Sequence, residues 1–216
     1  KLFPKINFFF HDFSDISYGS NVNLMKHITV STFDRLFLPR VLDKLDKVLY
    51  LDVDILVRGD VGQLYDTKLG DKVFAGKKSE LDGWASLIDV ITRVSLSLPP
   101  KKAWALRRRA HATGKLTADT YNAGILLMNL KKMRDEDFIE NNLYLVEELR
   151  LNDQDVMNFY SAGRALNLDG DWNYVPTQDY SKNPKIVHWA GPAKPWKQAF
   201  ALYKDEFQAI AKELKA

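Results

Sequence analysis

Two aspartates, Asp52 and Asp54, follow directly after the apolar run of residues 47–51. If the extended geometry of a strand continues through them, both carboxylates point to the same side, because side chains alternate along a strand. Two like charges so close repel each other unless a cation lies between them, and magnesium or manganese prefers carboxylate oxygens. The pair therefore indicates a metal site, although two aspartates that cap the end of a strand explain the motif alone equally well.

A candidate third ligand, His188, opens the segment of residues 188–196, which follows another predicted strand. If that strand ends at the same edge of a sheet, its imidazole meets the two carboxylates, and such a ligand set suits manganese better than magnesium. Gly191 lets the backbone approach a phosphate closely, and Lys194 supplies a positive charge. A histidine buried in the core is the alternative explanation of His188.

The third polar cluster is Asn152-Asp153-Gln154-Asp155, which precedes an apolar stretch that begins at Val156. Asn152 or Asp153 is expected to cap the helix that follows. Side chains at the start of a helix also point into the crevice where anions and reacting centres lie. Capping and chemistry are compatible in this segment.

Alternating strands and helices are expected to position these groups. The predicted strands are Ile6 to Phe10, Lys47 to Leu51, Ile125 to Met128 and Ile186 to Trp189, with a loop over residues 11–23. Three helices are predicted. A short helix runs through Phe33 and Phe37, with Ser31 or Thr32 as its cap, and Pro39 is expected to disturb it. A long helix covers residues 131–149, and an amphipathic helix covers residues 198–214. This order predicts an α/β sandwich with a mostly parallel central sheet flanked by helices. Ligands of such sheets bind beyond the carboxyl ends of the strands.

Residues 82–118 interrupt the alternation and predict a basic helical excursion. An apolar segment, residues 87–98, precedes Pro99-Pro100, and residues 101–115 then hold six Lys or Arg, one His and no acidic residue. A solvated basic face explains this composition. The alternative is contact with anionic lipid headgroups or with a phosphorylated acceptor.

Composition limits the remaining classes of function. The chain of 216 residues has a net charge of +3, which is too small to indicate a nucleic-acid partner. It contains no cysteine, so disulfides and thiolate catalysis are excluded. No apolar run is long enough for a membrane span, and residue 1 does not begin a signal peptide. We expect one domain over residues 1–216 in a cytoplasmic protein whose only membrane contact is peripheral, through residues 101–115.

Together, these segments resemble glycosyltransferase family 8, and most of all its bacterial lipopolysaccharide galactosyl and glucosyl transferases. The matching stretches are Phe33 to Leu36, Lys47 to Asp54, Tyr121 to Leu130, Asn152 to Asp155 and His188 to Trp196. The resemblance covers about residues 5–200 and implies a GT-A (Rossmann-like) fold, a UDP-sugar donor and a manganese ion. It further implies transfer of a hexose, galactose or glucose, to a hydroxyl of a glycan or glycolipid acceptor, with retention at the anomeric carbon.

The resemblance also assigns roles to single residues. The implied metal ligands are Asp52, Asp54 and His188. The implied catalytic pair is Asp153 and Gln154. The implied donor-binding residues are Arg35, Asp52, Val53, Asp54, Asn122, Ala123, Gly191 and Lys194. Retention requires a covalent intermediate on a carboxylate or same-face attack within an ion pair. Gln154 is a poor nucleophile and favours the ion pair, whereas Asp153 is the nearby carboxylate for the covalent route. The sequence leaves both open.

Two departures from the family pattern affect these expectations. The family normally begins with a strand, a helix and a strand that bind uracil and ribose, and this chain starts at the strand after them. The resemblance therefore implies a single GT-A domain shortened at its N-terminal side, which binds UDP poorly by itself. Residues 82–118 differ from the bacterial pattern, and Glu80 or Asp82 is expected to face the acceptor. The alternative function is a non-catalytic binding module that keeps the fold.

Overall fold

The computed structural model describes residues 5–16, 30–80, 85–176, 183–197 and 201–214. The strands are β1 (Lys47–Leu51), β2 (Ile55–Val57), β3 (Phe74–Lys78), β4 (Tyr121–Asn129), β5 (Ala165–Asn167) and β6 (Ile186–His188). The α-helices are α1 (Asp34–Val41), α2 (Val61–Tyr65), α3 (Leu87–Ser97), α4 (Pro100–Ala112), α5 (Leu130–Asp135), α6 (Phe138–Glu147), α7 (Asp153–Ser161) and α8 (Lys204–Glu213), with 3-10 turns η1 (Val30–Phe33) and η2 (Gly170–Asn173).

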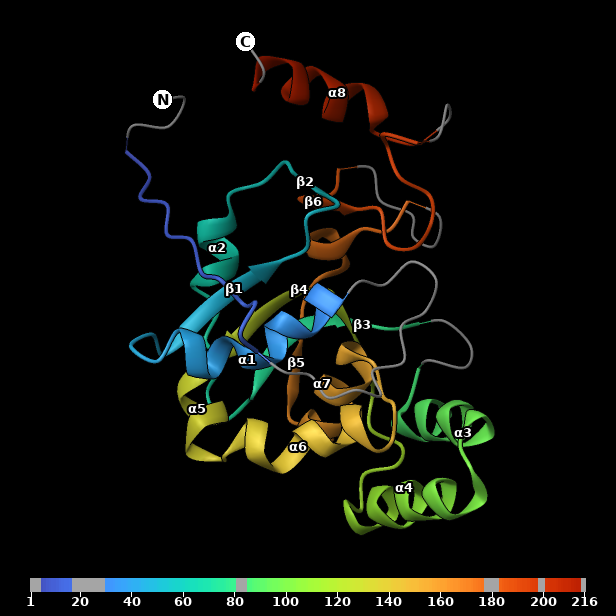
Figure 1. Cartoon of the computed structure of the whole chain (residues 1–216). Coiled ribbons are helices and arrows are strands. Elements are labelled where there is room, and N and C mark those ends of the chain that lie inside the picture. The colour runs from blue at the N-terminus through green and yellow to red at the C-terminus, as the bar shows by residue number, and fades with distance from the viewer. Residues whose placement is uncertain (1–4, 17–29, 81–84, 177–182, 198–200, 215–216) are drawn as a thin grey trace.

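The main sheet has the strand order β1-β4-β3-β5 among the described residues (Figure 1). Strands β1, β3 and β5 run in one direction, as a mostly parallel sheet requires. The long β4 runs the opposite way between β1 and β3, so both of its ladders are antiparallel and only the ladder of β3 with β5 is parallel. Helices cover the sheet, and the expected α/β class is confirmed.

Strand β4 lies at the centre of the core because its residues are apolar on both faces. Leu126 and Met128 pack into a large cluster with the helices α1, α3 and α7, whereas Ile125 and Leu127 face a second cluster beneath α2 and η2. All four side chains are at most 1% exposed. A continuous apolar run is the expected pattern for a strand that is covered on both faces.

The predicted strand at residues 6–10 is wrong. This run has no regular secondary structure, and Ile6, Phe8, Phe9 and Phe10 are 55 to 95% exposed. An apolar run becomes a buried strand only where a neighbouring strand completes its hydrogen bonds, and residues 6–10 pair with no strand of the described sheet. The predicted loop after it is described only over residues 11–16.

The helix predicted over residues 131–149 is two helices, α5 and α6. Asp137 separates them with a φ of 49°, a left-handed conformation that interrupts an α-helix. The new direction lets Phe138 pack against the ring of Tyr160, with centroids 4.6 Å apart. The sequence pattern missed the break because apolar residues continue at helical spacing on both sides of it.

The other two predicted helices exist with different ends. Helix α1 follows directly on η1, which contains Ser31 and Thr32, and Pro39 lies inside α1 instead of ending it. Helix α8 begins only at Lys204, because Tyr203 adopts a left-handed φ of 61°; residues 198–200 lie outside the described chain. None of the α8 side chains is fully buried, so its apolar side is less covered than the pattern suggested.

Residues 85–118 contain two helices, α3 and α4, which lie together away from the sheet (Figure 1). Pro100 occupies the first turn of α4, where a missing N–H costs no hydrogen bond. Glu80 is exposed just after β3, and Asp82 lies outside the described residues. Within the described ranges, no helix has the length and apolar character that crossing a bilayer requires.

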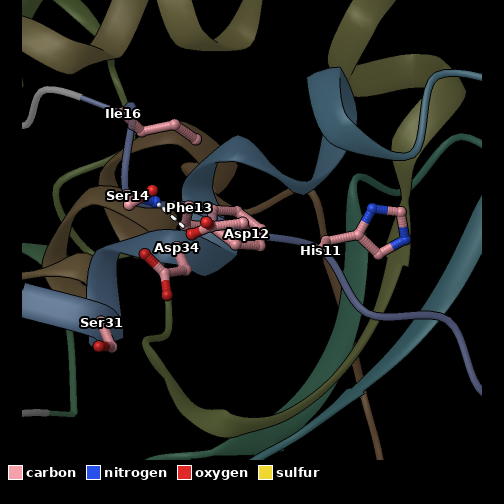
Figure 2. A pocket seen from close by; sticks show the side chains of 7 residues that line it. All are labelled: His11, Asp12, Phe13, Ser14, Ile16, Ser31 and Asp34. Atoms are coloured by element: carbon pink, nitrogen blue, oxygen red, sulfur yellow. Dashed lines mark hydrogen bonds between the residues drawn. The ribbon is translucent and has the colours of Figure 1, made fainter.

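A hollow of about 450 Å³ lies between residues 11–16 and the start of α1 (Figure 2). Ser14 N donates a hydrogen bond to Asp12 Oδ1 (2.8 Å) at its rim, and the imidazole of His11 lies apart from the carboxylates of Asp12 and Asp34. The candidate metal ligands do not line this hollow, so it is separate from the site described next.

Candidate metal and donor site

The sheet edges bring Asp52, Asp54 and His188 together. Asp52 N donates to Gly124 O of β4 (2.8 Å), which fixes the chain where β1 ends. In the ladder of β2 with β6, Ile55 pairs with His188, and Trp189 N donates to Asp54 O (3.0 Å). His188 Nε2 therefore lies 3.7 Å from Asp52 Oδ2 and 3.5 Å from Asp54 Oδ1. These ligand atoms lie within 4.8 Å of one another, which allows them to hold one metal ion.

A chain of amide groups determines which nitrogen of His188 faces the carboxylates. Gly124 N–H donates to Asn122 Oδ1 (2.9 Å), which identifies that atom as the amide oxygen. Asn173 Nδ2 donates to the same oxygen (2.9 Å), so Asn173 Oδ1 is the atom 2.9 Å from His188 Nδ1. Since an amide oxygen only accepts, the neutral imidazole carries its proton on Nδ1. The lone pair of Nε2 therefore faces the two carboxylates, as a metal ligand requires.

Replacing Asn173 by alanine is expected to lower manganese affinity by about 10- to 100-fold, because the imidazole loses the acceptor that fixes its tautomer and orientation. Isothermal titration calorimetry of the purified chain measures this directly. Asn142→Ala is the matched control, since Asn142 is also buried but hydrogen-bonds to Phe138 O far from the metal ligands. Equal losses of manganese affinity in both variants would show that Asn173 acts only through stability.

Asp52 offers only one oxygen to a metal. Its other oxygen, Oδ1, accepts hydrogen bonds from Tyr50 OH (2.7 Å) and from Arg35 Nη2 (2.9 Å). The Arg35 guanidinium also stacks on the Tyr50 ring, 4.4 Å from its centroid. These contacts orient the carboxylate so that Oδ2 points at His188. Sequence reasoning missed both Tyr50 and Asn173, because a strand tyrosine and an asparagine in a turn are ordinary structural residues.

Arg35 joins the aspartate of β1 to the start of α7. Its side chain is 4% exposed, and besides Asp52 it contacts Asp153 Oδ2 (3.0 Å from Nε) and donates to Ala123 O. Burial raises the pKa of Asp153, and the charge of Arg35 opposes this rise. The guanidinium thus lies in the wall of the site, between two carboxylates.

Lys194 contacts the second aspartate. Its ammonium donates to Asp54 Oδ2 and to Trp189 O (2.7 Å), while Asp54 Oδ1 faces His188. Burial opposes ionisation of Asp54, but the ammonium of Lys194 outweighs it and holds the pKa of Asp54 well below its usual value. The carboxylate is therefore charged at neutral pH and suited to a cation. Gly191, with a φ of 86°, turns the loop that carries Lys194.

Helix α7 begins at the site. Asn152 caps it by accepting from Asp155 N (2.7 Å), as the sequence suggested. Gln154 Oε1 accepts from Ala123 N (3.0 Å), which fixes its amide against β4. Burial raises the pKa of Asp155 to about 6, although the guanidinium of Arg93, 2.8 Å away on α3, opposes the rise. This ion pair links α7 to α3.

These groups line one open cavity of about 640 Å³, a volume within the range of ligand pockets. Every candidate site residue lines it except Val53, whose side chain is 95% exposed and lies outside the cavity. The lining residues are Thr32, Arg35, Asp52, Asp54, Asn122, Ala123, Gly124, Asn152, Asp153, Gln154, His188, Ala190, Gly191, Pro192, Lys194, Trp196 and Lys197. The cavity thus offers a cation site beside a basic group and a row of amides.

Comparison with known proteins gives a consistent result. Residues 4–199 match the family described as glycosyl transferase family 8. The chain is 27% identical over 190 residues to a lipopolysaccharide 1,3-galactosyltransferase of Salmonella typhimurium, covering 79% of this chain and 50% of that protein. It is 28% identical over 177 residues to a lipopolysaccharide 1,2-glucosyltransferase of Escherichia coli, covering 74% and 46%. The chain spans about half the length of these curated relatives.

Solved structures share the fold. The galactosyltransferase LgtC, crystallised with donor and acceptor sugar analogues, superposes with a TM-score of 0.61 at 26% sequence identity. The match covers 88% of this chain and 69% of that one. The expected GT-A fold is thereby confirmed.

Proposed function

Because the chain belongs to glycosyltransferase family 8, we propose that it transfers galactose or glucose from a UDP-sugar to a hydroxyl of a glycan or glycolipid, with manganese as the metal and with retention. The observation that carries this proposal is the cluster of Asp52, Asp54 and His188 with its Nε2 lone pair turned inward. Two carboxylates and one imidazole are a donor set that manganese accepts, and magnesium is the second choice.

The chain's own groups fit the charges of the transfer. A sugar that leaves UDP develops positive charge at the anomeric carbon while negative charge grows on the diphosphate. Manganese, when bound, neutralises part of that negative charge. Lys194 lies beside the same carboxylates and supplies a second positive charge, and the backbone at Gly191 is open to a phosphate. The leaving diphosphate therefore needs no proton.

The amides of the cavity suit the sugar, and the contacts of Asp153 favour the ion-pair route. Asp153 is 6% exposed and bound to Arg35, so its carboxylate is a poor candidate for covalent attack. Gln154 lines the cavity, and its carbonyl oxygen, which accepts from Ala123 N, keeps a second lone pair for the positively charged sugar. We therefore infer same-face attack by the acceptor, with Asn122 along the sugar.

Manganese-dependent release of UDP tests the proposal. The assay compares UDP-galactose with UDP-glucose, and it uses the whole protein that contains this sequence, since the chain spans only part of its relatives. We expect release with at least one of the two donors, and we expect Asp54→Asn to reduce it by at least about 100-fold, because the metal loses a charged ligand. Manganese binding without any release would favour the non-catalytic module. Weak UDP binding by the chain alone stays a prediction.

A further inference from the structure

The positive charge of the chain is concentrated on and beside α4. Residues 101–115 carry six Lys or Arg and no acidic side chain, which exceeds the net charge of +3 of the whole chain. The remaining chain is therefore slightly acidic, and the molecule has one basic end. None of these residues lines the cavity that holds the metal ligands, so the basic end does not serve the donor.

The helical period determines which side of α4 faces outward. Leu106 and Ala110 are fully buried and pack α4 against the body of the protein. Lys101, Trp104 and Arg108 lie on the opposite side of the helix, at successive turns, and all three are exposed. Trp104 is 63% exposed, which is unusual for the largest apolar side chain. In Figure 1, α4 is an outermost element of the molecule.

Several of these cations are not used by the fold. Lys102 donates to Glu148 O (2.7 Å), and Arg109 stacks on the Tyr144 ring, 4.3 Å from its centroid. Across the described part of the chain, no carboxylate lies within ion-pair distance of the remaining four, Lys101, Arg107, Arg108 and Lys115. Arg108 contacts the ring of Trp104 on the same helix, 5.3 Å from its centroid, which leaves its charge unneutralised. These four charges are therefore available to an anionic partner.

A groove of about 360 Å³ adjoins the outward side of α4, between this helix and α6. Trp104, Arg108 and Arg109 line it, together with Tyr144 and Glu148. The hydroxyl of Tyr144 is buried beneath the groove, beside the guanidinium of Arg109, and is closed to a ligand there. The two guanidinium groups of Arg108 and Arg109 are donors that a phosphate oxygen accepts, and Glu148 offsets at most one of their two charges.

We propose that α4 binds the surface of an anionic phospholipid bilayer. Lys101, Arg107, Arg108 and Lys115 face the negative headgroups, and the ring of Trp104 enters the interface between headgroups and acyl chains, where tryptophan is favoured. One headgroup phosphate lies in the groove against Arg108 and Arg109. An acidic protein would use the same charges but would not explain a tryptophan that stands out of the basic face.

Vesicle co-sedimentation of the protein tests this inference. Vesicles of phosphatidylcholine alone are compared with vesicles in which about a third of the lipid is phosphatidylglycerol. We expect binding only to the anionic vesicles, weakened by added salt, and a loss of at least about 30-fold in the double variant Lys101→Glu, Arg108→Glu. Arg109→Gln removes one of the two guanidinium groups from the groove and is expected to weaken binding about fivefold.

A matched control separates this surface from net charge. The double variant Lys44→Glu, Lys68→Glu makes the same change of charge at exposed positions outside α4, and it is expected to bind within about threefold of the original chain. Equal losses in the two double variants, or no binding of the original chain to anionic vesicles at low salt, would refute the proposal. Unchanged binding of Arg109→Gln would remove the groove from it. Manganese affinity is expected to be unchanged in every variant.

Discussion

Replacing Gly124 by alanine is expected to lower manganese affinity by at least about 100-fold, and donor turnover with it. Gly124 lies on β4 directly beneath the candidate metal ligands. A Cβ atom added there lies 2.9 Å from both Asp52 Oδ2 and His188 Nε2, and closer still to His188 Cε1. The backbone cannot yield, because Gly124 O accepts from Asp52 N in the sheet edge. The imidazole must therefore leave its position.

Gly170→Ala is the matched control for this prediction. A Cβ atom at Gly170 meets only the Lys77 Cε atom, at an ordinary contact distance of 3.9 Å. Calorimetry with manganese and thermal melting of both variants separate loss of the site from loss of the fold. Manganese binding by Gly124→Ala with unchanged affinity would mean that the ion does not lie between Asp52 and His188.

Arg35→Ala is expected to destabilise the protein by about 3–5 kcal/mol, because it leaves the buried carboxylate of Asp153 without its counter-charge. Asp153 is 6% exposed, and its pKa is already raised by burial, so without Arg35 it must become protonated or unfold the start of α7. Asp52 loses the same partner. Equilibrium unfolding in urea measures the change in the free energy of unfolding.

Arg40→Ala on the same helix provides the comparison. Arg40 forms an ion pair with Glu140 at 2.8 Å, but both side chains are more than half exposed, so the loss is expected to stay below about 1 kcal/mol. A similar cost for both arginines would show that the contacts of Arg35 with Asp52 and Asp153 are no stronger than a surface ion pair.

The sequence predicted that Asp52, Asp54 and His188 meet, because their positions depend on strand ends. Asp52 and Asp54 follow a strand, and His188 ends another, so the expectation that they meet required only that β1, β2 and β6 lie at one edge of the fold. It did not require knowledge of the order of all strands. The reversed direction of β4 was not predicted, because a buried apolar run reads the same in either direction.

Other features depend on tertiary contacts or on single backbone angles, and the sequence pattern did not predict them. Residues 6–10 have the composition of a buried strand, but burial depends on a neighbour that the run itself does not specify. Asn173 acts through a hydrogen-bonding contact with His188, 15 residues further along the chain, which local spacing does not show. Tyr50 lies two residues before Asp52 on the same side of the chain, so its spacing was visible, but spacing alone does not show that its hydroxyl orients the carboxylate. The break at Asp137 depends on one backbone angle in an otherwise periodic segment.

Pulsed electron paramagnetic resonance of Mn²⁺ bound to the purified chain tests the central claim most directly. We expect one ion per chain with a directly coordinated imidazole nitrogen, and we expect the nitrogen signal to disappear in His188→Gln. A spectrum with only oxygen ligands, identical in the original chain and in the variant, would show that the imidazole does not join the two carboxylates on one cation.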